Sequence, residues 1–339
     1  MRTFKKSSPK RIALLLTPVN LRRFTPGLVP FVSSNFDFLQ IDPHRSITEI
    51  LGILKNSKVD GLVTEYLPGI NEHLMKLNIP TIVCPNDYND VGAKSLTYID
   101  VNDIKVGEMA AEHFHNLGFK NFAFLGNDSF YSRRRENGYT HFLKQKSIVP
   151  NTFKVKFKKT VQYTEYWIEE DKGFIQWIKD LPRPCAILVA HDPLGRHLAQ
   201  NCLQNEIEVP EEISILGVNN DDLVSSLANP PLSSIMIPWD KIGFEIGRNM
   251  EKLLAGQKLA GQTILIDPTN IITRRSSDVT AVSDPIIPKA LAFIRDNITT
   301  GINVSDVVEH VHVNRRTLEK SFRTHLNRSP REEIVRIRI

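Results

Sequence analysis

The sequence predicts an α/β protein with two successive lobes, each built on a doubly wound parallel sheet, and a small all-helical segment at the C-terminus. Short apolar runs alternate with segments of helical period through most of the chain, which is typical of a parallel sheet covered by helices on both faces. This alternation starts again at Asn121, and from Ile287 onward only helical periods remain. A length of 339 residues leaves room for two or three domains.

The first series of elements opens with a continuous apolar run at residues 12–16, which predicts a buried strand. The polar residues 17–23 are expected to form a loop at the carboxyl end of this strand. A helix at 103–117 closes the series, because Gly118 favours the left-handed conformation that ends helices. Between them we expect a weak helix at 26–34, strands at 36–41, 59–64, 80–85 and 95–101, and helices at 47–56 and 71–77.

The second series begins with a strand at residues 121–126 and contains the most informative stretch, residues 183–222. Here an apolar run at 186–190 precedes a helix, and a second apolar run follows at 213–218. Strand, crossover helix and strand form the unit that builds a parallel sheet. The other expected elements are helices at 132–146, 163–179 and 239–255, strands at 154–160, 263–267 and 270–273, and an extended segment at 230–238.

Polar side chains follow both strands of this unit. His191 and Asp192 come after the first strand, and Asn219, Asn220 and Asp221 come after the second. Parallel sheets bind ligands beyond the carboxyl ends of their strands, so these residues are candidates for contacts to a small polar molecule. Asp and Asn are equally favoured as helix caps and turn residues, and the spacing alone leaves both interpretations open.

The positive charge of the chain is concentrated near the C-terminus. From residue 286 onward ten Lys and Arg stand against six Asp and Glu, which accounts for +4 of the formal net charge of +5. This distribution indicates an anionic partner for the C-terminal segment only.

The cysteines and the N-terminus bear on where the protein works. Cys84, Cys185 and Cys202 are widely spaced and odd in number, so we expect reduced, buried thiols and neither a disulfide framework nor a metal site. The apolar run near the basic N-terminus covers only residues 12–16, which is too short for a signal peptide or a membrane span. We therefore expect a cytoplasmic protein.

The sequence does not predict an enzyme. It contains no Gly-x-Ser-x-Gly elbow, no Walker loop, no His-Glu-x-x-His and no Gly-x-Gly-x-x-Gly after the first strand. His113 and His115, like His310 and His312, are two residues apart and cannot share a helix face, so a histidine metal site is not expected. We expect no cofactor.

The C-terminal segment has the pattern of a helix-turn-helix. Helices are expected at 287–297, 304–311 and 315–326, with a tight turn between the last two. Ser305 is a candidate cap for the second helix and Asn314 for the third. Basic side chains lie off the apolar face of the third helix, where they suit phosphates and guanine edges, although an ordinary solvated basic helix would show the same period. These side chains are Arg315, Arg316, Lys320 and Arg323.

Specific stretches resemble two known families. Residues 183–192, 209–220 (VPEEISILGVNN) and 229–235 (NPPLSSI) resemble the effector domain of LacI-type repressors, which has a two-lobed periplasmic-binding-protein-like fold. Residues 291–330 resemble the first helix-turn-helix of AraC-type activators. A sensor domain in front of an AraC-type domain is the order found in xylose operon regulators, and the junction, with Thr273-Arg274-Arg275-Ser276-Ser277-Asp278, is similar to theirs.

The resemblance implies a function and a domain organisation. It implies a sugar-responsive transcription regulator, in which xylose or a related pentose closes the two lobes and alters DNA binding, most simply as a homodimer. The alternative is a sugar-binding sensor without effective DNA binding. The implied domains are a sensor at 1–277, with lobes at 10–118 plus 239–266 and at 119–238 plus 267–277, a linker at 278–287 and a DNA-binding domain at 288–339.

The resemblance also assigns sites. Arg135 matches the position whose guanidinium forks onto sugar hydroxyls, a geometry that Lys cannot reproduce. Asp192 and Asn219 match acceptor positions at the two strand ends, Trp167 is a candidate aromatic face for the sugar, and Glu65 is expected to contribute from the first lobe together with residues 17–23. For DNA the implied contacts are Asn314, Arg315, Arg316, Thr317, Lys320 and Arg323.

The chain departs from the family patterns in several places. Val308 stands where AraC-type domains have a small residue, His312 where they have Gly, and Asn314 where they have Ser. Asn219 replaces the Asp common in LacI-type repressors. The AraC-type pattern continues with a second helix-turn-helix, whereas this sequence stops at Ile339, so we expect the first helix-turn-helix only, as in a C-terminally truncated regulator.

Overall fold

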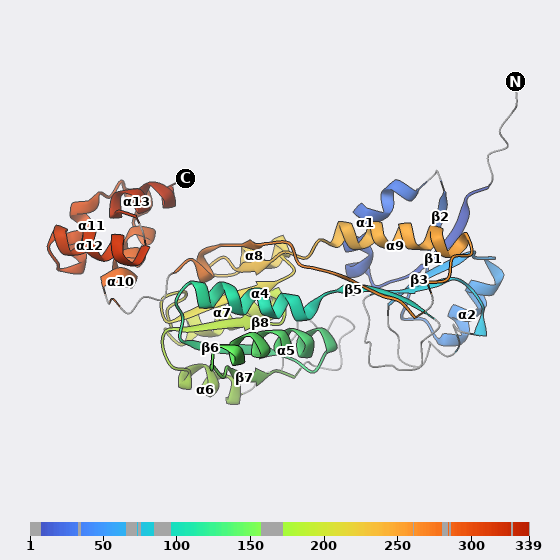
Figure 1. Cartoon of the computed structure of the whole chain (residues 1–339), viewed down its shortest axis with the longest axis horizontal. Coiled ribbons are helices and arrows are strands. Elements are labelled where there is room, and N and C mark those ends of the chain that lie inside the picture. Colours follow the sequence, from blue (N-terminus) through green and yellow to red (C-terminus); the bar gives the residue numbers. More distant parts are fainter. Residues whose placement is uncertain are drawn as a thin grey trace, which may run out of the picture. The chain divides into compact units, whose positions relative to one another are not determined.

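The structure is a computed structural model that describes residues 8–32, 35–65, 73, 76–84, 96–156, 172–259, 261–279, 284, 286–326 and 328–338. The chain divides into two compact units. The first consists of Met1–Asn102 and Ile237–Thr269, and the second of Asp103–Met236 and Asn270–Ile339 (Figure 1). Each unit therefore combines two segments that are separated in the sequence.

The first unit is organised on a six-stranded parallel sheet with the order β11-β5-β4-β3-β1-β2. The chain runs from β1 outward to β2 and then returns to β3 on the other side of β1. This reversal makes the carboxyl ends of β1 and β3 the topological switch point, where open α/β sheets bind ligands. The elements are β1 (Lys10–Leu15), α1 (Pro18–Leu28), η1 (Val29–Phe31), β2 (Phe36–Gln40), α2 (Ile47–Asn56), β3 (Gly61–Thr64), β4 (Thr81–Val83), β5 (Thr97–Val101), α9 (Trp239–Leu254) and β11 (Thr263–Ile266).

The prediction of a loop at residues 17–23 is wrong, because residues 18–23 form the first half of α1 and Thr17 is its N-cap. Pro18 occupies the first helical turn, where its fixed φ favours a helix and its missing N–H is not needed. Helix α1 lies beside α9 (Figure 1), and Phe24 is fully buried with its ring centroid 6.0 Å from that of Trp239, the first residue of α9. The two helices approach so closely that a Cβ at Gly27 would lie 1.9 Å from the Asp240 carbonyl oxygen, and one at Gly243 would lie 2.2 Å from that of Phe24.

The second unit contains another six-stranded sheet, with the order β12-β10-β9-β8-β6-β7. All its pairs are parallel except the short β12, which runs antiparallel to β10. Here the switch point lies between β6 and β8. The elements are α4 (Asp103–Asn116), β6 (Asn121–Gly126), α5 (Phe130–Gln145), β7 (Asn151–Lys154), α6 (Lys172–Asp180), β8 (Cys185–Val189), α7 (Asp192–Gln204), β9 (Ile213–Val218), α8 (Asp222–Leu227), β10 (Ser233–Ile235), β12 (Ile271–Ile272) and η3 (Arg275–Ser277).

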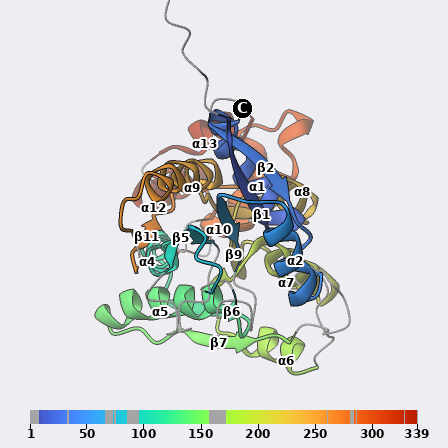
Figure 2. The same cartoon turned by 90° about the vertical axis from the view of Figure 1, so that its right-hand side faces the viewer.

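Helix α4 belongs to the second unit, whereas the sequence placed residues 103–118 with the first lobe. The helix lies side by side with α5 (Figures 1 and 2). A Cβ at Gly107 would come within 2.1 Å of the Arg135 carbonyl oxygen, so the absence of a side chain permits this packing. Helical period alone shows which face of α4 is apolar, but not which lobe covers it.

Two predicted elements of this region differ in extent. The strand expected at residues 154–160 is β7, which begins and ends earlier at Asn151–Lys154. The helix expected at 163–179 is represented by α6, from Lys172 to Asp180, and Trp167 lies outside the described residues. The helix expected at 71–77 also falls largely outside them.

The C-terminal helices form a domain with its own core. They are α10 (Ile286–Asp296), η4 (Ile298–Thr300), α11 (Val304–Val311), α12 (Arg315–Leu326) and α13 (Pro330–Arg338). Leu318 and Phe322 of α12 are fully buried against residues of the other helices. The remaining core residues are Ile287, Ala290, Leu291, Ile294, Ile302, Val307, Leu326 and Ile334.

The caps of these helices correct one prediction. Helix α11 is capped by Asn303 rather than Ser305, because the Asn303 side chain accepts from the Ser305 N–H at 2.7 Å and Asp306 accepts from the Asn303 N–H at 2.7 Å. At the other end, His312 has φ +54°, the left-handed conformation for which the family uses Gly. Asn314 caps α12, as predicted, by accepting from the Thr317 N–H at 2.8 Å.

The cysteines are buried and unpaired in the fold. Cys84, Cys185 and Cys202 are free, buried thiols, and burial raises the pKa of Cys185 and Cys202 to about 12. Within the described residues no cluster of three or more His, Cys, Asp or Glu side chains is arranged to hold a metal ion. The helices described for this chain include none that is both long and apolar enough to cross a membrane.

Candidate ligand site and nucleic-acid interface

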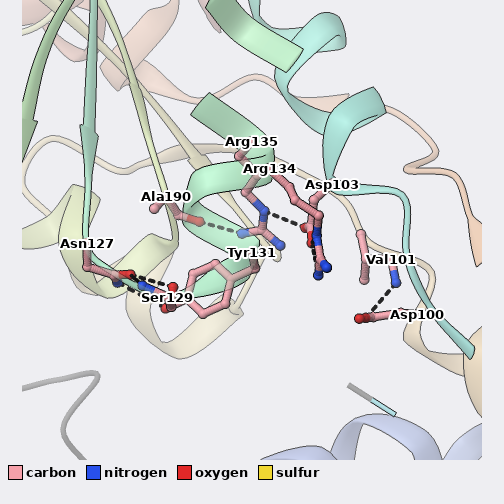
Figure 3. A network of polar contacts seen from close by, with 9 residues as sticks. All are labelled: Asp100, Val101, Asp103, Asn127, Ser129, Tyr131, Arg134, Arg135 and Ala190. Carbon is pink, nitrogen blue, oxygen red and sulfur yellow. Dashed lines mark hydrogen bonds and ion pairs between the residues drawn. The ribbon is translucent and has the colours of Figure 1, made fainter. Parts of the chain in front are cut away.

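Arg135 lies at the switch point of the second sheet. It projects from α5, which follows β6, and only 3% of the residue is exposed. Its Nε donates to Oδ1 of Asp103 at 2.8 Å, and its Nη1 donates to the carbonyl oxygen of Ala190 at the end of β8 (Figure 3). These bonds use two of the five guanidinium N–H groups, so the plane of the fork is fixed before any ligand arrives.

The acidic partner of Arg135 is itself buried and shared. Asp103 accepts from Nη2 of Arg134 at 3.0 Å as well as from Arg135, and its side chain is 1% exposed (Figure 3). A buried carboxylate is stable only when it is paired, and here two guanidinium groups meet it. Asp103 is the first residue of α4 and therefore anchors the start of that helix to α5.

Tyr131 and Asn127 lie in the same part of the candidate site as Arg135, although the sequence analysis did not predict them. The Asn127 side-chain amide donates to the Tyr131 hydroxyl at 3.1 Å, and its oxygen accepts from the Ser129 N–H at 2.8 Å (Figure 3). The guanidinium carbon of Arg135 lies 5.1 Å from the centroid of the Tyr131 ring. Their position in the sequence could have indicated them, because both residues follow β6 just as His191 and Asp192 follow β8.

The two polar residues after β8 have different environments. The ring of His191 lies edge-on to the ring of Tyr131, with 6.0 Å between the centroids. Asp192 is completely buried and connects the ends of β8 and β9 with β10, because its Oδ1 accepts from the Ser234 hydroxyl at 2.6 Å and its Oδ2 accepts from the Asp221 N–H at 2.8 Å. The carboxylate therefore holds the loop after β9, whatever else it contacts.

The loop after β9 has an unusual backbone. Asn219 has φ +110° and Asn220 has φ +49°, and asparagine tolerates such left-handed conformations better than most residues. The Asn219 N–H donates to the Ile235 carbonyl oxygen at 3.0 Å, and the Asn220 N–H donates to the Ser234 hydroxyl at 3.0 Å. Asp221 caps α8 through its carboxylate, so for this residue the cap interpretation of the sequence holds.

In the first unit, Glu65 lies at the switch point between β1 and β3. Its carboxylate accepts from the backbone N–H of Thr17, the N-cap of α1. A carboxylate in this position is favoured by the helix dipole and by the unpaired N–H groups of the first turn. Glu65 thus contacts the start of α1, so the residues expected to contribute from the first lobe meet at a helix terminus and not at a loop.

Replacing Asp192 by Asn should flatten the pH dependence of stability. Burial raises the pKa of the Asp192 carboxyl from 3.8 to about 7. Between these pH values the folded protein holds a proton that the unfolded chain has released, so the free energy of unfolding falls as the pH rises and levels off above the folded pKa. Urea unfolding of both proteins at several pH values between about 5 and 8 measures this. Parallel profiles for wild type and Asp192→Asn would contradict the assignment.

Helix α12 presents a basic face to solvent and an apolar face to the core. Arg315, Arg316, Lys320 and Arg323 are exposed, whereas Leu318 and Phe322 are buried. Nε of Arg315 donates to Glu319 at 2.9 Å, and Thr317 is bound to the Asn314 cap through its N–H and its hydroxyl. The second helix of a helix-turn-helix enters the major groove, and this face has the charge and the length of side chain for that contact.

Comparisons with family models define the class of protein. The family of periplasmic binding protein-like domains matches residues 111–277, and the AraC family of bacterial regulatory helix-turn-helix proteins matches residues 294–334. Both matches agree with the two-lobed α/β fold and the C-terminal helices. The chain is a transcription regulator with a periplasmic-binding-like domain in front of an AraC-type helix-turn-helix, as the sequence predicted.

Comparison with individual relatives identifies the family within this class of regulators. The xylose operon regulatory protein of Haemophilus influenzae is 30% identical over 278 residues, which cover 80% of this chain and 70% of that protein. That of Escherichia coli K12 is 26% identical over 266 residues, 78% of this chain and 68% of the relative. The chain belongs to the family of xylose operon regulatory proteins.

Solved structures support the fold. The structure of a xylose-binding transcription activator is similar with a TM-score of 0.72, at 21% identity, and the match covers 98% of this chain and 86% of that one. A periplasmic binding protein/LacI transcriptional regulator from Alkaliphilus metalliredigens, complexed with D-xylulofuranose, matches 79% of this chain and 99% of that one, with a TM-score of 0.63 and 16% identity. The predicted fold class is thereby confirmed.

Proposed function

We propose that this regulator responds to a monosaccharide, xylose or a related pentose, bound at the carboxyl ends of the sheet strands. The observation that carries the proposal is the fixed guanidinium of Arg135 beside Tyr131 at the β6–β8 switch point. Sugars are recognised by planar donors that fork onto neighbouring hydroxyls and by aromatic faces that pack on their C–H groups. The xylose operon regulatory proteins among the relatives favour a pentose.

Each predicted contact takes a role in this proposal. Arg135 donates to the sugar hydroxyls, Asn219 offers its amide at the end of β9, and Tyr131 supports the ring of the sugar. Asp192 acts chiefly by holding the Asn219–Asp221 loop, since both of its oxygens already accept hydrogen bonds from the protein. Glu65 at the switch point of the first unit and Trp167 remain further candidates for contacts to the same ligand.

The regulatory step follows from linkage. We propose that sugar draws the two units of the sensor together and that a homodimer changes the spacing of its DNA-binding domains in response. Sugar must then bind the closed state more tightly than the open one, because a ligand shifts an equilibrium only by its difference in affinity. Such a regulator would work in the cytoplasm and would catalyse no reaction.

One experiment tests the sensor and the regulator together. Calorimetry of the whole chain with xylose, arabinose, ribose and glucose identifies the ligand, and fluorescence anisotropy measures DNA binding with and without it. The DNA probe is a duplex that the wild-type chain selects from a random pool, with and without xylose present. Pentose binding with no selectable duplex would favour the alternative, a sugar-binding sensor without effective DNA binding. Binding of none of the sugars would overturn the effector assignment.

Replacing Arg316 by Ala should weaken DNA binding by about fivefold to 150-fold, because an arginine contact to a base edge contributes roughly 1–3 kcal/mol. Arg316 is exposed on α12 outside the Arg315–Glu319 ion pair. Arg331→Ala removes an exposed charge from α13 and serves as the matched control. Anisotropy titrations at several salt concentrations measure both variants. Equal losses in the two would indicate a general charge effect and not a reading helix.

A further inference from the structure

A short connector segment, residues 274–277, leads from the candidate ligand site toward the DNA-binding domain. It contains η3 and precedes α10, the first helix of the helix-turn-helix domain. Ser276 and Ser277 are buried, although the segment lies at the junction of two domains. A junction that served only as a flexible tether would not need buried anchors.

Arg274 ties this connector to the loop after β9. Its Nη1 donates to the Leu232 carbonyl oxygen at 2.8 Å, and its Nη2 donates to the side-chain oxygen of Asn220 at 2.8 Å. Nη2 also lies 3.6 Å from Oδ1 of Asp222. Arg274 thus donates to the side chain of Asn220, the residue directly after Asn219. Asn219 is the proposed sugar contact.

The loop that Arg274 contacts is left-handed at two consecutive residues, a conformation that asparagine tolerates better than most residues. Asn219 and Asn220 both have positive φ, and backbone of this kind persists only where the surroundings fix it. The Ser234 hydroxyl accepts from the Asn220 N–H and donates to Asp192, so the loop has a fixed partner on the sheet side as well. A ligand that reorients Asn219 therefore acts on a loop that several hydrogen bonds hold in place, and Arg274 links this loop to the connector.

The connector has a second set of bonds to β10. The Ser233 hydroxyl accepts from the Arg274 N–H and donates to the Arg274 carbonyl oxygen, both at 2.8 Å. The Ser276 hydroxyl accepts from the Ser233 N–H at 2.8 Å and donates to the Ile215 carbonyl oxygen at 2.7 Å. These bonds keep the connector on the sheet when the Arg274 side chain is removed, and the Arg274 guanidinium adds the contact that links the connector to the loop after β9.

We propose that Arg274 is a positioning residue that transmits the state of the Asn219–Asp221 loop to the connector, and through it to the DNA-binding domain. This inference rests on the proposed function, because it requires a ligand at the loop and a response at the DNA. When sugar contacts the loop, the side chain of Asn220 moves and the guanidinium of Arg274 moves with it. The connector then changes the orientation of the start of α10. Arg274 touches neither sugar nor DNA in this scheme.

Three variants of the whole chain test the proposal. Arg274→Ala removes the fork, and Arg274→Lys keeps the charge but cannot donate to Leu232 and Asn220 in the same geometry. Arg183→Ala is the matched control. Arg183 donates to two backbone carbonyl oxygens and lies 3.5 Å from a carboxylate, with a side chain 24% exposed against 20% for Arg274, but it precedes β8 at the opposite end of the sheet.

The measured quantity is the ratio of DNA affinities at saturating xylose and without xylose, obtained with the selected duplex. Wild type and Arg183→Ala should show the same ratio, about fivefold or more in either direction. Arg274→Ala and Arg274→Lys should bind xylose within about threefold of wild type and still bind DNA, yet their ratio should fall to about one. A purely structural role would lower both affinities and leave the ratio intact.

The two proposals fail in different ways. A wild-type chain whose DNA affinity does not change with xylose would overturn the proposed function, and the transmission by Arg274 with it. A wild-type chain that responds, beside an Arg274→Ala chain that responds equally, would overturn the role of Arg274 alone. A ratio reduced equally in Arg183→Ala would also overturn it, because the effect would then not depend on the loop after β9.

Discussion

Arg135→Ala should lose xylose binding by at least about a hundredfold, because it removes charge-assisted hydrogen bonds that contribute roughly 1.5–3 kcal/mol each. The guanidinium is positioned by Asp103 and Ala190, so the wild-type side chain loses little freedom when sugar binds. Calorimetry with xylose measures the change. Binding within about threefold of wild type would remove Arg135 from the site and move the effector to another surface.

Two further variants separate recognition from folding. Arg135→Lys keeps a cation beside Asp103 but offers no planar fork, and it should also bind xylose poorly while its unfolding midpoint stays close to that of wild type. Arg133→Ala changes the same helix at a side chain that packs over Phe130, 4.3 Å from the ring centroid, and should leave xylose affinity unchanged. A normal affinity in Arg135→Lys would show that charge alone suffices.

Phe322→Ala should unfold or greatly weaken the C-terminal domain, with a cost of about 3–5 kcal/mol for truncating a buried aromatic side chain. Phe322 is fully buried in the core formed by α10, α11, α12 and α13. A core this small has few other contacts to compensate. Thermal unfolding followed by circular dichroism should show an early transition, and DNA binding should be lost while xylose binding is retained.

Thr324→Ala is the control for this prediction, since Thr324 lies on the same helix with an exposed side chain. It should leave both the unfolding profile and DNA binding close to wild type, as surface substitutions usually do. If Phe322→Ala also abolished xylose binding, the sensor and the C-terminal domain would not fold as separate units, and the proposed division of labour between them would fail.

The fold was predictable because its strands are continuous apolar runs and its helices have one buried face. The run at residues 12–16 and the unit from 186 to 218 could be assigned from local pattern, since burial on both faces leaves few polar residues in a strand. The place of α4 was not predictable in this way. Its partner α5 is the next helix, after β6, but periodicity shows only which face of α4 is apolar and not which lobe covers that face.

The wrong predictions for single elements arose where the sequence favoured two different local structures about equally. Residues 17–23 are polar enough for a loop, yet Pro18 at the start and Phe24 on the buried face make them a helix once α9 is present. Asn303 and Ser305 are both good N-caps, and the presence of Asp306 three residues after Asn303 decided between them by completing a capping box. Such choices depend on one hydrogen bond, which sequence patterns resolve poorly.

The candidate site was predictable only in part. Their position at strand ends indicated His191, Asp192 and Asn219, and the family resemblance indicated Arg135. Neither showed that both carboxylate oxygens of Asp192 already accept hydrogen bonds from Ser234 and from the loop after β9. Tyr131 and Asn127 escaped notice because aromatic and amide side chains are common near helix starts. Their role depends on the distance to Arg135, which only the folded chain defines.

The assembly of the first unit from two separate segments has a consequence for synthesis on the ribosome. Helix α1 packs against α9, where the ring centroids of Phe24 and Trp239 lie 6.0 Å apart, and β5 has β11 as its outer neighbour. Yet α9 begins only at residue 239 and β11 at residue 263. Domains usually fold in the order in which they emerge, but here the first lobe must wait for the second to be made. Nascent chains that pause between the two segments would expose the apolar side of α1 and depend on chaperones, whereas the contiguous C-terminal domain can fold as soon as it emerges.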